Sequence, residues 1–420
     1  MNIKKIPLSK KELEQITAEY PTPFHLYDEK AIRENARAFY SAFSWAPGFK
    51  NYFAVKACPN PTILKILKGE GMGADCSSLP ELILADRVGF KGEEIIFTSN
   101  NTPAEEFIEA ARLGAVINLD DISHIEYLEK SAGIPRLLFF RFNPGEASFS
   151  NAIIGSPQEA KYGVTRDQLI DAYRLAKKKG TRRFALHTMI VSNELNVESF
   201  ADTARLLFET AVEIKEKTGI HLETINFGGG MGIPYRPTET AINLEELSSA
   251  IAAIYKRIIV PASLDPINIA FECGRMVTGP YGYLVSRVRH VVEKYKRYVG
   301  LDASMADLMR PGIYGAYHHI TVPGKEEQPT EMIYDVTGSL CENADKFAID
   351  RPLPLIEPGD LLVIHDTGAH GYAMGYNYNA KLRPAELLLR GDGDIQLIRR
   401  AETIDDYFAT MRFPEAPVEV

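Results

Sequence analysis

Short apolar runs rich in β-branched and aromatic residues alternate with amphipathic helical stretches as far as about residue 271. Apolar residues recur at helical spacing most clearly over residues 167–179 and 199–217. This alternation implies right-handed βαβ units and a parallel sheet, and eight strands favour a closed (β/α)8 barrel over an open sheet. The expected strands cover residues 51–55, 73–77, 94–98, 115–119, 136–141, 184–191, 223–227 and 267–271.

Beyond about residue 274 the helical periodicity largely disappears. A barrel accounts for about 250 of the 420 residues, and we expect the remainder to form a mostly β domain. The early run at 23–27 precedes the first barrel helix and is expected to join that domain. We therefore predict a barrel at residues 29–275 and a β-sandwich or β-barrel domain built from residues 1–28 and 276–420. Its expected strands cover residues 283–292, 295–301, 332–337, 360–365 and 385–390.

Charge and cysteine usage argue against several kinds of partner. The formal net charge of −9 disfavours nucleic acid or an anionic membrane surface as a partner. The chain starts without an apolar signal-peptide core and has no run long enough to span a bilayer, so we expect a cytoplasmic protein. The cysteines are far apart and form no CxxC pair, which argues against a disulfide framework or a metal site. They are Cys58, Cys76, Cys273 and Cys341.

Polar and glycine-rich positions occur where the expected strands end. In a (β/α)8 barrel the chemistry is carried at the carboxyl ends of the strands. This coincidence is the strongest local indication that the barrel is an enzyme. The positions are Lys56, Asp75, Asn100, Asp120, Arg141, Ser192, residues 228–230 and Glu272.

Lys56 follows an apolar strand and precedes a turn that contains two prolines. A lysine in such a place is commonly a surface residue. At a barrel mouth, however, desolvation lowers the pKa of a lysine and lets its amine form a Schiff base.

Three consecutive glycines at residues 228–230 follow the seventh expected strand. Their backbone N–H groups can converge on an anion, and barrels often bind phosphate in a late βα loop. A flexible turn is an equally simple interpretation. The motif is not a dinucleotide fingerprint, because the third glycine would fall at Ile233, and no Gly-Lys-Ser/Thr sequence follows as in a Walker loop.

Three further places in the sequence carry side chains that could take part in binding or catalysis. Glu272 and Arg275 form either a structural ion pair or a pair of ligands for a ring nitrogen and a carboxylate. Arg310 has the planar fork that suits a carboxylate, although a surface loop is the simpler interpretation. Cys341 lies beside Glu342, whose charge disfavours a thiolate, so the thiol is expected to donate a proton rather than act as a nucleophile.

Taken in order, these motifs resemble those of the pyridoxal-phosphate-dependent decarboxylases with the alanine-racemase fold, and most closely those of the diaminopimelate decarboxylases. The resemblance covers nearly the whole chain, and the order of the motifs makes it specific although each motif is weak alone. The matching positions are Lys56, Gly73-Ala74-Asp75, residues 228–230, Glu272 to Arg275, Arg310 with Tyr314 and Ala316, Cys341-Glu342 and Tyr378-Asn379.

The resemblance implies an alanine-racemase-like enzyme of fold type III, with pyridoxal 5′-phosphate as cofactor and an amino acid as substrate. It implies decarboxylation of meso-2,6-diaminopimelate to L-lysine, the last step of lysine biosynthesis, in a homodimer whose subunits share their active sites. Lys56 and Cys341 would be the catalytic residues. The cofactor would contact Lys56, Asp75, Arg141, Ser192, Gly229, Gly230, Glu272, Gly274, Arg275, His370 and Tyr378. The substrate would contact Arg275, Arg310, Tyr314, Glu342, His370 and Tyr378.

The sequence departs from the family pattern at four positions. Met189 stands where the family has a histidine that stacks on the cofactor ring, and a thioether can also pack on an aromatic face. His187 is retained two residues earlier, and strand alternation points it to the same side. Val191 replaces a glycine, Cys273 a proline and His370 a tyrosine.

Three other functions stay open from the sequence. The first is a decarboxylase of another diamino acid, such as ornithine, lysine, arginine or a substrate of the carboxynorspermidine type. The second is a racemase, which would not need the Cys341-Glu342 pair. The third is a non-catalytic pyridoxal-phosphate-binding protein, which would not need the ~150 residues that follow the barrel.

Overall fold

The computed structural model describes residues 4–46, 48–145 and 159–414. The chain divides into two compact units: Glu29–Pro280 forms the first, and Lys4–Asp28 with the residues from Tyr281 onward forms the second. The expected domain boundary after residue 275 falls at the start of helix α10 (Arg275–Thr278), which belongs to the first unit.

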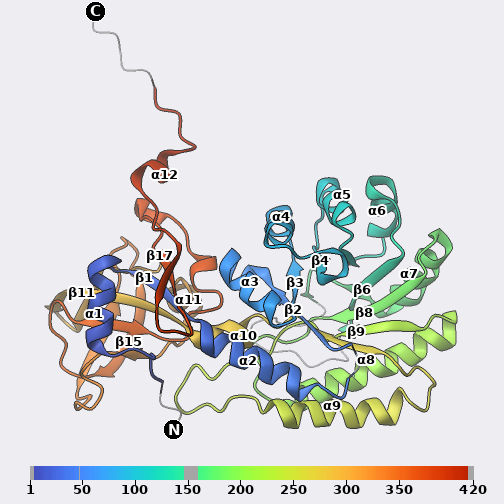
Figure 1. Ribbon diagram of the computed structural model, residues 1–420, viewed down its shortest axis with the longest axis horizontal. Coiled ribbons are helices and arrows are strands. Elements are labelled where there is room, and N and C mark those ends of the chain that lie inside the picture. Colours follow the sequence, from blue (N-terminus) through green and yellow to red (C-terminus); the bar gives the residue numbers. More distant parts are fainter. Residues whose placement is uncertain (1–3, 47, 146–158, 415–420) are drawn as a thin grey trace, which may run out of the picture. The chain divides into compact units, whose positions relative to one another are not determined.

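The first unit is a closed barrel of eight parallel strands, as predicted, with the helices outside the strands (Figure 1). The strand β10 pairs with β2 on one side and with β9 on the other, and β5 pairs with β6, so that no barrel strand is left at an edge. The strands are β2 (Lys50–Ala54), β3 (Gly73–Cys76), β4 (Ile95–Thr98), β5 (Val116–Leu119), β6 (Leu137–Asn143), β8 (Arg183–Thr188), β9 (Leu222–Asn226) and β10 (Asn268–Phe271), with the short β7 (Val164–Thr165) beside β6.

One predicted barrel strand extends too far. The strand expected at 184–191 ends at Thr188, because its neighbour β9 ends at Asn226, which is the partner of His187. Met189 and the residues after it therefore leave the barrel ladder.

Side-chain caps begin several of the barrel helices directly after the strand-to-helix turns. Asn60 accepts a hydrogen bond from the N–H of Thr62 at the start of α3, and Asn196 and Asn243 cap α8 and α9 in the same way. The helices of this unit are α2 (Glu29–Ala42), α3 (Pro61–Gly69), α4 (Leu79–Val88), α5 (Ala104–Leu113), α6 (His124–Ala132), α7 (Arg166–Lys179), α8 (Val197–Thr218) and α9 (Leu244–Ile258).

An apolar layer fills the barrel interior, and a polar layer follows it along the strands. The apolar layer consists of Tyr52, Ile96, Val116, Leu137, Phe139, Ala185 and Ala270. Side chains two residues apart on a strand point to the same side. Moving on by two residues from five of these positions therefore gives a second inward-facing layer. It consists of Thr98, Asn118, Arg141, His187 and Glu272.

The second unit is a mixed β-sheet with β1 (Phe24–Asp28) near its middle. The strand β1 pairs antiparallel with β11 and parallel with β17, so the N-terminal segment belongs to this sheet, as expected. Strands were expected at five places after the barrel, and all five form: β11 (Gly282–Glu293), β12 (Arg297–Leu301), β14 (Met332–Thr337), β16 (Leu361–Ile364) and β17 (Ala385–Leu389). Three more strands were not predicted: β13 (Ile320–Thr321), β15 (Lys346–Leu353) and β18 (Ile395–Arg399).

Short helices complete the second unit. Helix α1 (Lys10–Glu19) starts with a capping box between Ser9 and Glu12 and packs Leu13 and Ile16 into the core with β1. The other two are α11 (Arg310–Tyr314) and α12 (Ile404–Phe408).

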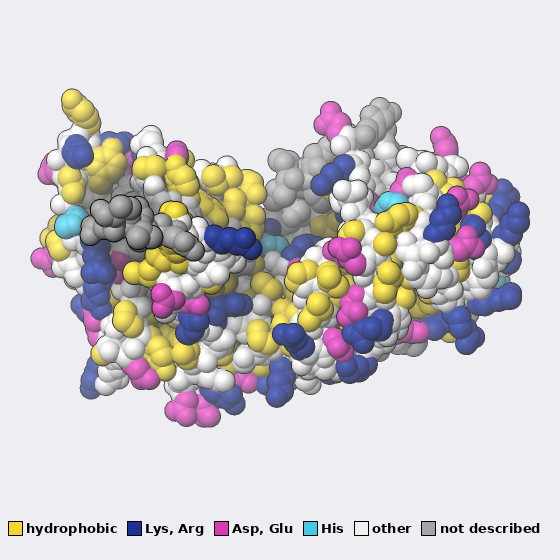
Figure 2. Space-filling model, turned by 90° about the horizontal axis from the view of Figure 1, so that it is seen from above, with side chains coloured by type: hydrophobic (Ala, Val, Ile, Leu, Met, Phe, Trp, Pro, Cys, Tyr) yellow, Lys and Arg dark blue, Asp and Glu magenta, His cyan; other side chains and the backbone are white. Residues whose placement is uncertain are grey.

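The surface of the protein carries charged side chains of both signs. Basic and acidic side chains are interspersed over the face drawn in Figure 2. Across residues 4–46, 48–145 and 159–414, no helix is long and apolar enough to cross a membrane.

Candidate active site

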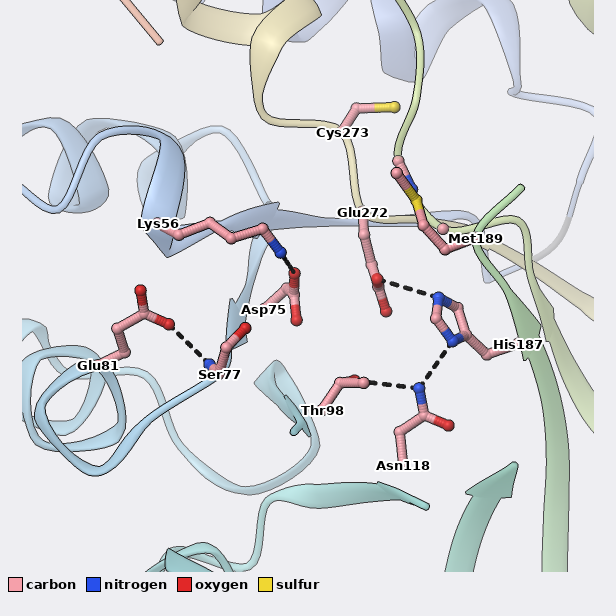
Figure 3. A network of polar contacts seen from close by, with 12 residues as sticks. Lys56, Asp75, Ser77, Glu81, Thr98, Asn118, His187, Met189, Glu272 and Cys273 are labelled. Atoms are coloured by element: carbon pink, nitrogen blue, oxygen red, sulfur yellow. Dashed lines mark hydrogen bonds and ion pairs between the residues drawn. The ribbon is translucent and has the colours of Figure 1, made fainter. Parts of the chain in front are cut away.

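Lys56 lies on the 3-10 turn η1 (Val55–Ala57), directly after β2. Its Nζ is 3.6 Å from Oδ2 of Asp75 on the neighbouring strand β3 (Figure 3). Slightly more than half of the lysine side chain is exposed, whereas the Asp75 carboxylate is buried. The Asp75 carboxylate raises the pKa of the Lys56 ammonium despite partial desolvation. The expectation of a lowered pKa at Lys56 is therefore wrong for this state of the site, because a carboxylate lies beside the amine.

Asp75 is the second charged group of the barrel mouth. Burial, together with the charge of Glu272, raises the pKa of Asp75 to about 8. Its Oδ1 atom is buried and has no hydrogen-bond partner among the described residues. An orphaned oxygen of this kind indicates that the site is shaped for a further polar group.

Glu272 follows β10, and each of its carboxylate oxygens has a polar contact, of which Figure 3 draws the one with His187. Oε1 accepts a hydrogen bond of 2.8 Å from Nδ2 of Asn226, and Oε2 lies 3.1 Å from Nε2 of His187. Burial alone would raise the pKa of Glu272, but the contact with His187 and the charge of Lys56 bring it below its usual value. The environment thus separates the two buried carboxylates: Asp75 holds a proton more readily and Glu272 less readily.

Arg141 on β6 adds a second cation. Its Nη1 lies 3.4 Å from Oδ1 of Asp120, and its guanidinium stacks on the ring of Tyr162 with 3.8 Å to the centroid. Arginine stacked in this way keeps its edge for hydrogen bonding. Tyr162 was not singled out by the sequence, because it lies outside the expected strands.

The glycine loop at residues 228–230 is tightly packed, so the flexible-turn interpretation is wrong. Gly228 has φ +67° and a Cβ on it would collide with the carbonyl oxygen of Thr188. A Cβ on Gly230 would lie 2.5 Å from the carbonyl oxygen of Val191, and one on Gly229 would lie 2.9 Å from that of Glu272. The loop therefore tolerates no side chain at these positions.

The amide groups of this loop are partly used within the barrel. The N–H of Gly228 donates to Oδ1 of Asn226 at 2.9 Å, and the N–H of Gly229 donates to Sδ of Met189 at 3.3 Å. Ser192 lies after β8 in the segment that pairs with the loop, where the N–H of Glu194 donates to the carbonyl of Gly230 at 2.9 Å.

Gly274 and Arg275 follow Glu272 on the same side of the barrel unit. A Cβ on Gly274 would lie 2.8 Å from Cβ of Ala57, which places this backbone against the turn that carries Lys56. Nη1 of Arg275 donates to the hydroxyl of Tyr235 at 2.5 Å. Tyr235 was not identified from the sequence.

The second unit brings together the cysteine, the glutamate and the closing tyrosine that the sequence singled out. The N–H of Cys341 donates to Oδ1 of Asn379 at 2.8 Å, and its Sγ lies 3.4 Å from the hydroxyl of Tyr378. The same hydroxyl donates to Oε1 of Glu342 at 3.1 Å. These contacts with Cys341 and Glu342 raise the pKa of Tyr378 to about 12. Cys341 is exposed.

Arg310 and Tyr314 share helix α11 but have different surroundings. Arg310 is 8% exposed, and its Nη1 lies 3.0 Å from Nε2 of His318, whose Nδ1 donates to the carbonyl of His365 at 2.8 Å. Tyr314 is exposed. Because Arg310 is buried and lies on a helix, the surface-loop interpretation of Arg310 is wrong. His370 lies in the turn before η6 (Tyr372–Met374), with φ +57°.

Comparison with known proteins gives the family context. Residues 29–279 match the family model described as "Pyridoxal-dependent decarboxylase, pyridoxal binding domain". Protein TabA of Pseudomonas amygdali pv. tabaci is 46% identical over 97% of this chain and 95% of that protein. The diaminopimelate decarboxylase of Methanothermobacter thermautotrophicus is 36% identical over 95% of this chain and 94% of that protein.

A solved structure agrees with this assignment. The crystal structure of diaminopimelate decarboxylase from M. jannaschii in co-complex with L-lysine superposes with a TM-score of 0.87 at 30% identity, covering 95% of this chain and 94% of that chain. The similarity therefore extends over both units.

The barrel mouth fits pyridoxal phosphate. Lys56 would supply an amine for the aldehyde, and Glu272 would supply a carboxylate for the ring nitrogen. The packed glycine loop lies beside Glu272, and Asp75 presents an orphaned oxygen. Within the described parts of the chain, no group of three or more His, Cys, Asp or Glu side chains is placed to hold a metal ion.

Gly228→Ala should reduce the cofactor bound per chain, because the new Cβ would displace the loop from Thr188. Gly219→Ala is a matched control, since Gly219 also has φ +67° but a Cβ there would meet nothing within 4 Å. Both variants carry a strain of about 1 kcal/mol, and only the first carries a collision. The measurement is the cofactor absorbance of each purified variant. Equal occupancy in both would contradict a packed loop at the cofactor site.

Proposed function

Because this chain belongs to the pyridoxal-dependent decarboxylases, we propose that it converts meso-2,6-diaminopimelate into L-lysine and carbon dioxide, the last step of lysine biosynthesis. Two comparisons support the choice of substrate: a diaminopimelate decarboxylase is 36% identical over nearly the whole chain, and a neighbouring structure of that activity binds L-lysine. The observation that carries it in this chain is the buried guanidinium of Arg310, fixed on His318. A cation held in this way suits the second carboxylate of the substrate.

The residues of the barrel mouth hold and tune the cofactor in this proposal. When bound, pyridoxal phosphate supplies the electron sink for breaking the bond to the carboxylate. Lys56 is the amine that binds its aldehyde, and Glu272 pairs with its ring nitrogen and keeps that nitrogen protonated. Asp75 and Arg141 orient these groups. The phosphate and the edge of the cofactor are contacted by Ser192, Gly229, Gly230, Gly274, Arg275, His370 and Tyr378.

In this proposal a further set of residues binds the substrate and moves its proton. Arg275, Arg310 and Tyr314 bind the distal carboxylate, and Glu342 binds the distal ammonium. His370 and Tyr378 also contact the substrate. Cys341 donates the proton to the carbon that has lost carbon dioxide, in a position held by its contacts with Tyr378 and Asn379. A positioned thiol can serve as a general acid.

The proposed assembly is a cytoplasmic homodimer in which Cys341 and Glu342 of one subunit complete the barrel mouth of the other. The exposure of Cys341 in the single chain supports this arrangement, since an acid that acts on a substrate has to be shielded from water in the working site.

Decarboxylation of another diamino acid is the second candidate. Protein TabA is 46% identical to this chain, more than the diaminopimelate decarboxylase at 36%, and its name states no substrate. Carbon dioxide release from ornithine, lysine and arginine, compared with release from meso-diaminopimelate, separates the two candidates.

Arg310→Ala should lower kcat/KM for meso-diaminopimelate by on the order of 10⁴-fold, because the distal carboxylate would lose a built-in partner. The bound cofactor should keep its absorbance. The matched control is Arg289→Ala, which removes a largely exposed arginine from the same unit and should leave turnover unchanged. Unchanged turnover in Arg310→Ala would remove the basis for naming this substrate.

Cys341→Ala should lower kcat by about 10²–10⁴-fold, the usual contribution of a positioned acid, while cofactor binding is retained. Ser339→Ala changes an exposed residue of the same loop and serves as the control. The measurement is the rate of carbon dioxide release under saturating substrate. A Cys341→Ala variant with the kcat of the unmodified enzyme would show that another group delivers the proton.

A further inference from the structure

His187 lies at the centre of a buried polar chain that the proposed mechanism does not use (Figure 3). The imidazole on β8 is 1% exposed. Its Nδ1 lies 2.8 Å from Nδ2 of Asn118 on β5, and its Nε2 lies 3.1 Å from Oε2 of Glu272. The chain thus runs across the barrel interior from β5 through β8 to the end of β10.

Asn118 determines which imidazole nitrogen carries the proton. Its Nδ2 also donates to Oγ1 of Thr98 at 3.0 Å. An amide NH₂ group has two donor hydrogens and no acceptor, so Nδ1 of His187 has to accept. The ring proton then resides on Nε2, where it faces the carboxylate of Glu272.

The surroundings of Glu272 act in opposite directions on the protonation of its carboxyl group. Burial and the neighbouring Asp75 carboxylate favour its protonated form. The contacts that favour its ionised form come from His187 and from the amide of Asn226. The charged groups that face it from other elements are Lys56 on η1 and Arg141 on β6. Within the described part of the barrel, Asn226 contacts one oxygen of Glu272 and His187 contacts the other.

We propose that His187 is a positioning residue that keeps Glu272 ionised and oriented at the barrel mouth, and that Asn118 fixes the imidazole tautomer that does so. The inference rests on the proposed role of Glu272 as the partner of the cofactor ring nitrogen. Without the His187 donor, a buried Glu272 beside Asp75 takes up a proton. A protonated carboxyl no longer stabilises a protonated ring nitrogen.

The proposed role of His187 matters more in this chain because residue 189 is a methionine. Met189 stands where the resembling family has a ring-stacking histidine, and its Sδ accepts the N–H of Gly229. A thioether has no proton to exchange near neutral pH. His187 supplies the imidazole that contacts Glu272, and Met189 contacts the glycine loop through its sulfur.

The test compares His187→Leu with His187→Gln. Leucine removes the donor, whereas the glutamine amide can present an N–H to Glu272. The readout is the dissociation constant of pyridoxal phosphate from the full-length enzyme, measured by absorbance titration between pH 5 and pH 9. Tyr173→Phe removes another buried hydrogen bond of the same barrel, to the carbonyl of Ala185, and is the matched control.

His187→Leu should bind the cofactor about tenfold or more weakly at pH 7, because a buried carboxylate would lose one of its two polar contacts. The lowered pKa of Glu272 keeps its carboxylate ionised down to a lower pH than usual in the native enzyme. In the leucine variant that pKa rises, so the affinity should fall as the pH decreases and recover toward pH 9. His187→Gln and Tyr173→Phe should follow the native profile.

Two results would overturn the proposal. Equal losses in the leucine and glutamine variants would mean that His187 only packs, and a loss independent of pH would mean that Glu272 does not change its ionisation. If His187→Leu does not fold, Asn118→Leu tests the same series of contacts at the residue next to His187. A native-like affinity of that variant for the cofactor at all pH values would count against the proposal. Glu272→Gln separates the two hypotheses: unchanged cofactor affinity there would refute the role of Glu272 itself.

Discussion

The barrel mouth depends on the placement of two buried carboxylates, Asp75 and Glu272, around the amine of Lys56. Each carboxylate alone would be costly to bury in ionised form. The structure separates them: Asp75 lies beside the ammonium with one oxygen unpaired, and Glu272 has a contact on each oxygen, from Asn226 and from His187. The pKa of Asp75 is thereby raised and that of Glu272 lowered, and in the proposed function the Glu272 carboxylate would pair with the ring nitrogen of the cofactor.

This arrangement follows from the geometry of parallel strands. The residues that close the barrel interior are apolar, and the next inward-facing position on several strands is polar. The polar layer therefore rests directly on a packed core, which restricts the rotamers of His187 and Glu272. The backbone of the glycine loop packs closely beside this layer. A Cβ on any of its three glycines would collide with the carbonyl of Thr188, Val191 or Glu272.

The sequence predicted the barrel well, because its strands are short apolar runs separated by helices with a clear 3.6-residue period. It missed β15, where charged residues and Pro352 interrupt the pattern, and β18, a half-exposed strand at the end of the sheet. The motif residues Lys56, Asp75 and Glu272 were identified because they end strands. Asn118 and Asn226 were missed as single amides inside apolar strands. The spacing of two residues from Val116 to Asn118 was the available signal, but the partner across the barrel is 69 residues away.

The central claim is that the amine of Lys56 binds the cofactor. The most direct measurement is reduction of the cofactor-loaded enzyme with borohydride, followed by proteolysis and mass spectrometry of the peptides. A single stable adduct on the peptide that contains Lys56 is the predicted result. An adduct on another lysine, or no adduct in an enzyme that has bound the cofactor and releases carbon dioxide, would contradict the account.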